Sequence, residues 1–191
     1  EQLSTEKTIT GSTISNLNAY PDTLMYKLDS TGNIQLDNLN TSREIDIATA
    51  YPLASKDGAY LVYNHDWGTP VYKFTANSSV PIAMNLHTPQ PELTGTKTLF
   101  WAKTHYSNVN HGSIYQFDGD SATPVLSDIN GSLIRYLSYN QTRIDNDLYV
   151  IATTEDGDQH ILAIDENDDI TVVKSLTISG SPTLINDEGQ L

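Results

Sequence analysis

Side chains that can bind ligands or transfer protons are concentrated in three short polar segments of the chain. Residues 64–69, 103–112 and 154–160 hold four of the five histidines, together with aromatic and acidic residues. Imidazole nitrogens donate hydrogen bonds or bind metal ions, aromatic faces stack on flat apolar surfaces, and carboxylates accept hydrogen bonds. The side chains that such a site would use are His65, Asp66, Trp67, His105, Tyr106, His111 and Asp158.

This combination of aromatic, imidazole and carboxylate groups is what a carbohydrate-binding surface requires. The apolar face of a pyranose ring stacks on an aromatic side chain, whereas its hydroxyl groups need directional hydrogen-bond partners. An alternative interpretation is that polar loops in an asparagine-rich protein collect histidine and tyrosine without a function, with Trp67 packed over the edge of a sheet. The sequence leaves both interpretations open.

The sequence specifies a metal site only loosely. The chain has no cysteine and no His-x-x-x-His or His-Glu-x-x-His pair, so a zinc site would need ligands from distant parts of the chain. Turns rich in Asp, Asn and Gly suggest calcium instead, because that cation prefers oxygen ligands. The candidate ligands are Asp165, Asn167 and Asp169, but Ile170 stands where an EF-hand loop needs glycine. The same residue types also form tight hairpins, which is the simpler interpretation.

Catalytic motifs are absent from the sequence. It contains no Gly-x-Ser-x-Gly, no phosphate-binding loop and no Gly-x-Gly-x-x-Gly. Carboxylate pairs such as Asp156 with Asp158, or Asp66 with Glu155, are expected in a chain with 24 acidic residues. They do not identify an acid and a base, so the catalytic residues stay unknown.

The three polar segments lie between stretches that repeat one apolar pattern. Leu61-Val62-Tyr63, Leu99-Phe100-Trp101 and Leu148-Tyr149-Val150 each precede a polar segment, and a second apolar stretch follows it. If Tyr26, Tyr72, Tyr115 and Leu162 are equivalent, the steps are 46, 43 and 47 residues. A period in the forties made of short strands is typical of β-propeller blades. The sequence therefore predicts an all-β chain, a propeller of about four antiparallel blades.

The repeats span residues 8–40, 48–87, 91–130 and 131–177 of a single domain. In the third strand of the second, third and fourth blades, Lys73, Gln116 and Ala163 each stand between two large apolar or aromatic residues. This alternation predicts one buried face and one less buried face for the strand. In a propeller the loops between second and third strands share one rim, so the polar segments would meet there. The expected strands are 49–55, 59–64, 70–75 and 80–86 in the second repeat, 92–96, 98–103, 112–117 and 123–129 in the third, and 133–141, 147–153, 159–165 and 170–176 in the fourth.

The ends of the chain allow two arrangements. Residues 182–191 resemble residues 52–61, which open the second repeat, so residues 181–191 would be the first strand of a fifth repeat or a closing strand; the first repeat lacks an obvious first strand. Residues 182–185 would then supply that strand and close a four-bladed ring, which removes exposed edges. In the other arrangement the chain is a fragment of a larger propeller and packs against its remaining blades.

One stretch carries a resemblance to a known class of repeat. Residues 112–120, Gly-Ser-Ile-Tyr-Gln-Phe-Asp-Gly-Asp, follow Leu99-Phe100-Trp101-Ala102. This unit resembles the β-propeller repeats of exported bacterial proteins, in which the third strand runs into an Asp-Gly turn. The resemblance extends over about residues 23–191 as a pattern and implies a fold. It implies no activity and no functional residue.

Composition narrows the classes of partner. The formal net charge of −14 repels phosphate backbones and anionic membranes, which argues against nucleic-acid binding. No stretch is long and apolar enough for a membrane span, and abundant Asn, Ser, Thr, Asp and Tyr suits a secreted, periplasmic or surface protein. We therefore expect a non-catalytic module that binds carbohydrate or protein, with no cofactor unless calcium binds. The alternatives are a propeller enzyme acting on extracellular polysaccharide and a structural element of a larger polypeptide.

Overall fold

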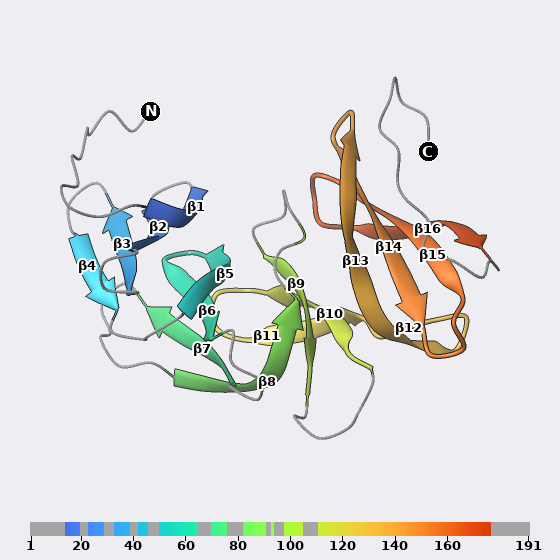
Figure 1. Ribbon diagram of the computed structural model, residues 1–191, viewed down its shortest axis with the longest axis horizontal. Helices are drawn as coiled ribbons and strands as arrows, with labels where there is room; N and C mark the ends of the chain where they lie inside the picture. The colour runs from blue at the N-terminus through green and yellow to red at the C-terminus, as the bar shows by residue number, and fades with distance from the viewer. Residues whose placement is uncertain are drawn as a thin grey trace.

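The chain folds into antiparallel β-sheets. The computed structural model describes residues 14–19, 23–28, 33–38, 42–45, 50–64, 70–75, 82–90, 93, 98–104 and 111–176. Every regular element in these ranges is a β-strand, and the strands form three sheets (Figure 1). The same ranges contain no helix long and apolar enough to cross a membrane. The predicted all-β class is confirmed.

The first sheet is a meander near the N-terminus. Its four strands follow one another in space as they do in sequence, and all pair antiparallel. Tyr26 and Gln35, which pair across the middle of the sheet, are both buried. The strands are β1 (Ile14–Ala19), β2 (Thr23–Leu28), β3 (Ile34–Asn38) and β4 (Ser42–Ile45).

The second sheet is a meander of seven strands that covers the second and third repeats. Its first turn, Asp57-Gly58, has φ angles of 50° and 77°, the two positive values that a two-residue hairpin turn matching strand twist requires. The strands are β5 (Ala50–Lys56), β6 (Ala59–Asn64), β7 (Pro70–Thr75), β8 (Ile82–Gln90), β9 (Leu99–Lys103), β10 (Ser113–Phe117) and β11 (Ala122–Leu126).

Strand β8 belongs to both of these repeats. Ile82 and Ala83 pair with β7, whereas Gln90 pairs with Trp101 of β9. His87 pairs with Pro70 on one side and with Lys103 on the other, so the exchange of partners occurs there. The two repeats are therefore joined through one strand into a continuous sheet.

The third sheet is curled and contains the fourth repeat (Figure 1). The turn Asn130-Gly131 opens it with φ angles of 55° and 85°, again the pair that a tight hairpin needs. The strands are β12 (Asp128–Ile129), β13 (Ser132–Ile144), β14 (Asp147–Thr154), β15 (Gln159–Ile164) and β16 (Ile170–Leu176).

Two hydrophobic clusters hold the repeats together, and strands β9 and β10 contribute to both. Phe100 and Tyr115 belong to the cluster shared with the second repeat, and their rings stack with centroids 5.8 Å apart. Trp101 and Ile114 belong to the cluster shared with the fourth repeat. Successive residues of a strand point to opposite faces, so the third repeat is packed on both sides.

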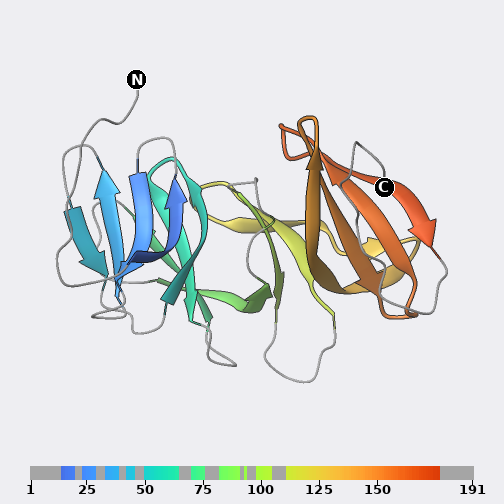
Figure 2. The ribbon, with the colours of Figure 1, turned by 45° about the horizontal axis from the view of Figure 1, so that its top comes forward.

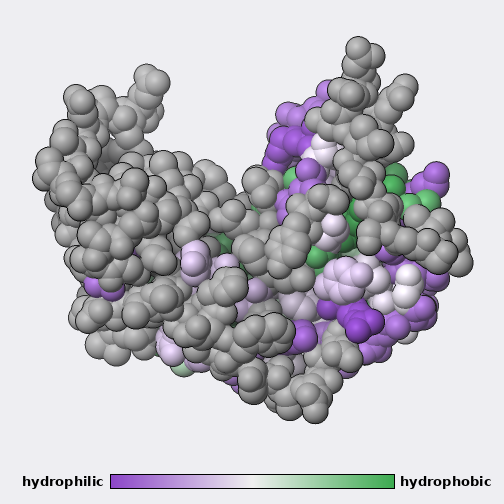
Figure 3. All heavy atoms as spheres, viewed as in Figure 1, coloured by the Kyte–Doolittle hydropathy of each residue, from purple (hydrophilic) through white to green (hydrophobic). Residues whose placement is uncertain are grey.

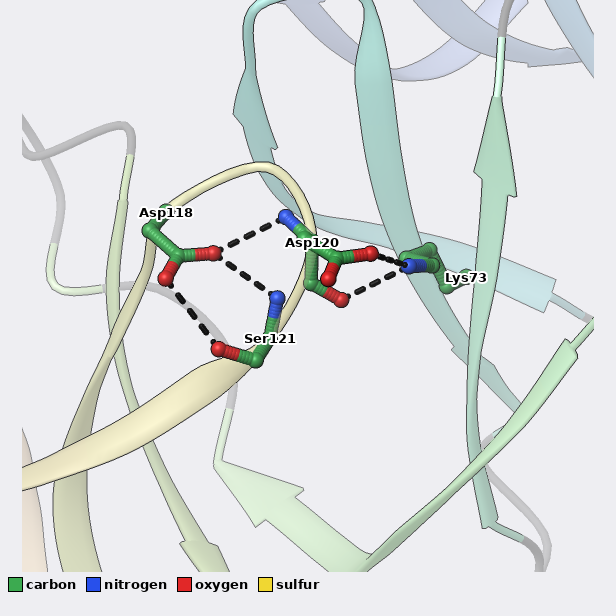
Figure 4. Close-up of polar contacts among 4 residues, drawn as sticks. All are labelled: Lys73, Asp118, Asp120 and Ser121. Carbon is green, nitrogen blue, oxygen red and sulfur yellow. Dashed lines mark hydrogen bonds and ion pairs between the residues drawn. The ribbon is translucent and has the colours of Figure 1, made fainter.

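A turn of the third repeat reaches back to the second repeat at one end of the sheets (Figure 4). Asp118 holds the turn by accepting hydrogen bonds from the backbone nitrogens of Asp120, at 2.9 Å, and Ser121, at 2.7 Å. Lys73 of β7 donates to the carbonyl and to the carboxylate of Asp120, both at 2.7 Å. A Cβ added at Gly119 would lie 3.1 Å from the backbone oxygen of Lys56. The turn therefore packs against the preceding repeat.

The fourth repeat makes a related contact at the same end. The turn that follows β15 brings the carboxylate of Asp168 to the hydroxyl of Thr98, which donates a hydrogen bond to it. Thr98 immediately precedes β9, so here too a turn after a third strand contacts the preceding repeat. We call this end of the sheets the aspartate rim, defined by Asp118, Asp120 and Asp165.

The predicted strands agree closely with those observed in the second and fourth repeats, and three differences are informative. The third repeat was expected to begin with a strand at 92–96, but the strand that pairs with β9 on that side is the end of β8. Of residues 92–96 the structure describes only Leu93, which lies outside any strand and is buried in the cluster shared with the fourth repeat. Strands β1 and β4 were not expected as such, since the first repeat lacked an obvious first strand and was expected to end at residue 40.

The third difference concerns burial. Gln116 in β10 is half-buried between buried neighbours, as expected for a strand with one less buried face. In β7, Lys73 is half-buried between half-buried Tyr72 and buried Phe74. In β15 all six residues are buried, including Ala163, so that prediction is wrong for the fourth repeat. Strand β15 lies inside the curled sheet between β14 and β16, and both of its faces are covered.

The sheets are arranged as an open arc. Figures 1 and 2 place the sheet of β1–β4 at one end and the sheet of β12–β16 at the other, with the seven-stranded sheet between them. Over the fourth repeat the described surface is mostly hydrophilic, with hydrophobic residues showing between (Figure 3). Val172 and Val173 of β16 are 41% and 49% exposed. Residues 182–185, expected to close a ring, lie outside the described residues.

Candidate functional site

The structure describes two of the seven residues predicted for the ligand-binding rim. His65, Asp66, Trp67, His105 and Tyr106 lie outside the described residues. The remaining two, His111 and Asp158, both lie at the end of the sheets opposite the aspartate rim. We call this end the histidine rim, defined by His87, His111 and Glu155.

A direct contact joins the third and fourth repeats at the histidine rim. Nδ1 of His111, just before β10, lies 2.9 Å from Oε1 of Glu155, which follows β14. The two side chains are 38% and 44% exposed. Both belong to connections between second and third strands, so equivalent segments of consecutive repeats meet here. The polar segments that the sequence singled out are therefore neighbours in these two repeats.

The turn that carries Asp158 is ordered by its own hydrogen bonds. Thr154 donates through Oγ1 to the carboxylate of Asp156 at 2.6 Å and through its backbone nitrogen to the carbonyl of Asp158 at 3.0 Å. The backbone nitrogen of Asp158 donates to Asp156 at 3.2 Å. These bonds, that from Thr154 first, lower the pKa of Asp156 below its usual value because they favour the carboxylate form. Glu155 is thus presented from a fixed turn.

Backbone contacts close the gap between the two repeats beneath the ion pair. Gly112 donates through its nitrogen to the carbonyl of Ile134 at 2.9 Å, and Glu155 donates to the carbonyl of Leu133 at 2.9 Å. A Cβ at Gly112 would lie 2.4 Å from the oxygen of Ala102 and 2.7 Å from a ring atom of Trp101. Glycine is therefore required for this close approach.

Three residues near the same corner were not predicted from the sequence. The indole nitrogen of Trp101 and Nδ1 of His87 are buried and have no hydrogen-bond partner among the described residues. Nζ of Lys103 lies 5.9 Å from the centroid of the Trp101 ring. The sequence placed these residues in or beside strands, and His87 comes onto the strand next to the other two only through pairing between β8 and β9. No local motif could have identified them.

Asp165 of the candidate calcium turn uses its carboxylate within the turn. Asp165 accepts hydrogen bonds from the backbone nitrogens of Asn167 at 2.8 Å and of Asp169 at 2.9 Å. These bonds, that from Asp169 first, lower the pKa of Asp165. In the part of the chain that the structure describes, no group of three His, Cys, Asp or Glu side chains could hold a metal ion. The turn is built as a hairpin cap, like the Asp118 turn one repeat earlier.

Comparison with known proteins leaves the chain without an assigned family. No protein-family model matches it, and no curated protein matches its sequence. The geometry of the histidine rim is therefore the basis for a functional assignment. That rim combines an exposed histidine and carboxylate pair, a half-buried lysine and two buried nitrogens, a set suited to hydrogen bonding with a polar ligand.

Proposed function

We propose that the chain is an arc of a β-propeller and serves as a non-catalytic module that binds carbohydrate at the histidine rim. The propeller interpretation is supported by contacts at both ends of the strands. Turns after third strands contact the preceding repeat through Lys73 and Thr98, and connections after second strands meet through His111 and Glu155. The blades of a propeller pack against one another on both faces, and the third repeat has a hydrophobic cluster on each side.

The open arrangement favours an arc that packs against further blades over a closed ring of four. The first and last sheets lie at opposite ends of the arc (Figure 2). Propellers contain four to eight blades, so further repeats or a second arc would complete the ring.

The contact between His111 and Glu155 is the observation that supports binding at this rim. This contact joins polar segments of consecutive repeats at the end of the strands where propellers usually bind ligands. Both side chains remain partly exposed. A hydrogen-bonded imidazole and carboxylate offer a donor and an acceptor in fixed positions, as sugar hydroxyls require. The composition further supports a secreted, periplasmic or cell-surface location.

Binding to an immobilised panel of neutral and acidic oligosaccharides tests the proposal. We expect at least one glycan to bind, and His111→Ala and Glu155→Ala to weaken that binding. Asp120→Asn on the aspartate rim is the matched control, since Asp120 is 96% exposed at the opposite end of the sheets. Absence of binding to every glycan, or equal binding by the rim variants and the control, would overturn the proposal; capture of a protein ligand instead would replace it with protein recognition.

A further inference from the structure

Two buried nitrogens without partners lie on neighbouring strands at the histidine rim. The indole nitrogen of Trp101 in β9 and Nδ1 of His87 in β8 make no hydrogen bond to any described residue, and Trp101 is only 2% exposed. An unpaired buried polar group costs about 1–3 kcal/mol, so native proteins seldom keep one without a reason. Two such groups on paired strands indicate a place where a polar ligand is held.

Strand pairing brings these groups to one face of the sheet. His87 pairs directly with Lys103, and residues that face each other across an antiparallel pair share a face. Lys103 and Trp101 are two residues apart on β9, and the ammonium lies over the indole ring. Trp101 belongs to the cluster shared with the fourth repeat, so this face is directed toward that repeat.

Gly112 directs the edge of the indole ring toward the gap between repeats. A Cβ at this position would lie 2.7 Å from Cζ2 and 2.8 Å from Cε2 of Trp101, and Cε2 carries the unpaired nitrogen. His111, the preceding residue, is tied to Glu155 of the fourth repeat. The corner defined by His87, Trp101, Lys103, His111 and Gly112 is thus built from the second and third repeats, and His111 ties it to the fourth.

The charges of this corner fit a single negative group. Among the described residues, no carboxylate forms an ion pair with Lys103, whereas the carboxylate of Glu155 is bonded to His111. One ammonium with two nitrogens that can form hydrogen bonds matches one carboxylate, and the chain's charge of −14 disfavours ligand groups with more negative charge. Sugar acids combine one carboxylate with hydroxyl groups for the imidazole nitrogens.

We propose that this corner binds the carboxylate of a single uronic-acid residue in an otherwise neutral glycan. Lys103 holds the carboxylate, the Trp101 indole donates a hydrogen bond to the same sugar, and His87 binds a neighbouring oxygen. The assignment rests on the proposed function as a carbohydrate-binding module and names the class of carbohydrate.

Titration of ¹⁵N-labelled protein with a trisaccharide of two galactose residues and one galacturonate residue tests the assignment. The chain has two tryptophans, so its spectrum contains two indole signals, and Trp101→Phe identifies one of them. We expect the acidic trisaccharide to shift the Trp101 signal, while its neutral galactose counterpart does not. Lys103→Gln should weaken binding about 10-fold or more, because it removes a hydrogen bond to a charged group. Trp101→Phe keeps the ring and should weaken binding about 5-fold.

The control is Lys174→Gln, which removes the same charge from an exposed position on β16. Unchanged affinity in Lys103→Gln, or equal losses in Lys103→Gln and Lys174→Gln, would overturn the assignment. Equal binding of the neutral trisaccharide would also overturn it while leaving the carbohydrate-binding function intact. A shift of the Trp101 signal by a glutamate-rich peptide and not by the sugar would replace the uronate with an acidic protein. If no glycan binds the wild-type chain, both proposals fail together.

Discussion

Gly112→Ala tests whether the third and fourth repeats approach as closely as the structure describes. The added methyl group would lie 2.4 Å from the backbone oxygen of Ala102 and within 2.8 Å of two ring atoms of Trp101. Overpacking of this kind costs about 1–3 kcal/mol. Loss of the hydrogen bond from Gly112 to Ile134 adds about 0.5–1.5 kcal/mol. We expect a loss of roughly 2–4 kcal/mol in the free energy of unfolding, measured by urea denaturation.

Gly157→Ala is the matched control for this measurement. Gly157 has a φ of +90° and open space around an added Cβ, so its substitution reports backbone strain without a clash. That strain amounts to about 1–2 kcal/mol. In a Trp101→Leu background the cost of Gly112→Ala should fall, because the ring atoms it meets are gone, while the cost of Gly157→Ala should not change. Independent, additive effects of Trp101→Leu and Gly112→Ala would refute the close approach.

Three further predictions concern other parts of the molecule. Phe100→Ala should reduce the free energy of unfolding by about 3–5 kcal/mol in urea denaturation, because Phe100 is fully buried in the cluster between the second and third repeats; a loss below 1 kcal/mol would contradict that packing. Lys73→Met should change the free energy of unfolding by no more than about 1 kcal/mol, since its partner Asp120 is 96% exposed, and a larger loss would show that the pair is better shielded from water than described. Because hydrogen bonds lower the pKa of Asp156 in the folded state, its stabilising effect is present at neutral pH and is lost as the pH falls through that lowered pKa. Urea denaturation between about pH 3 and 7 should therefore show a smaller acid-induced loss for Asp156→Asn than for wild type, and parallel curves would contradict the assignment.

Local sequence signals predicted much of the strand pattern. Strands β6, β7 and β16 begin and end where the alternation and the bounding turn residues predicted. Asp57-Gly58 and Asn130-Gly131 adopt the positive φ angles that their residue types favour. These features depend on neighbours in sequence, so the sequence is sufficient to identify them.

Features that depend on distant residues were not predictable in this way. The partner of β9 is the end of β8 and not residues 92–96, because pairing is decided by how the two repeats pack. At the histidine rim, His111 was identified as a candidate, but its partner Glu155 lies 44 residues away. The unpaired nitrogens of His87 and Trp101 are recognisable only once the buried atoms and their neighbours are known.

Strand β8 has a consequence for how the chain folds and comes apart. Repeats in a linear array usually unfold as separate units, each stabilised by its own residues and by its neighbours. Here, separating the second repeat from the third would break the hydrogen bonds of β8 to β7 or to β9. The two repeats therefore form a single cooperative unit, and the boundaries of the sequence repeat are not boundaries at which the protein can be divided.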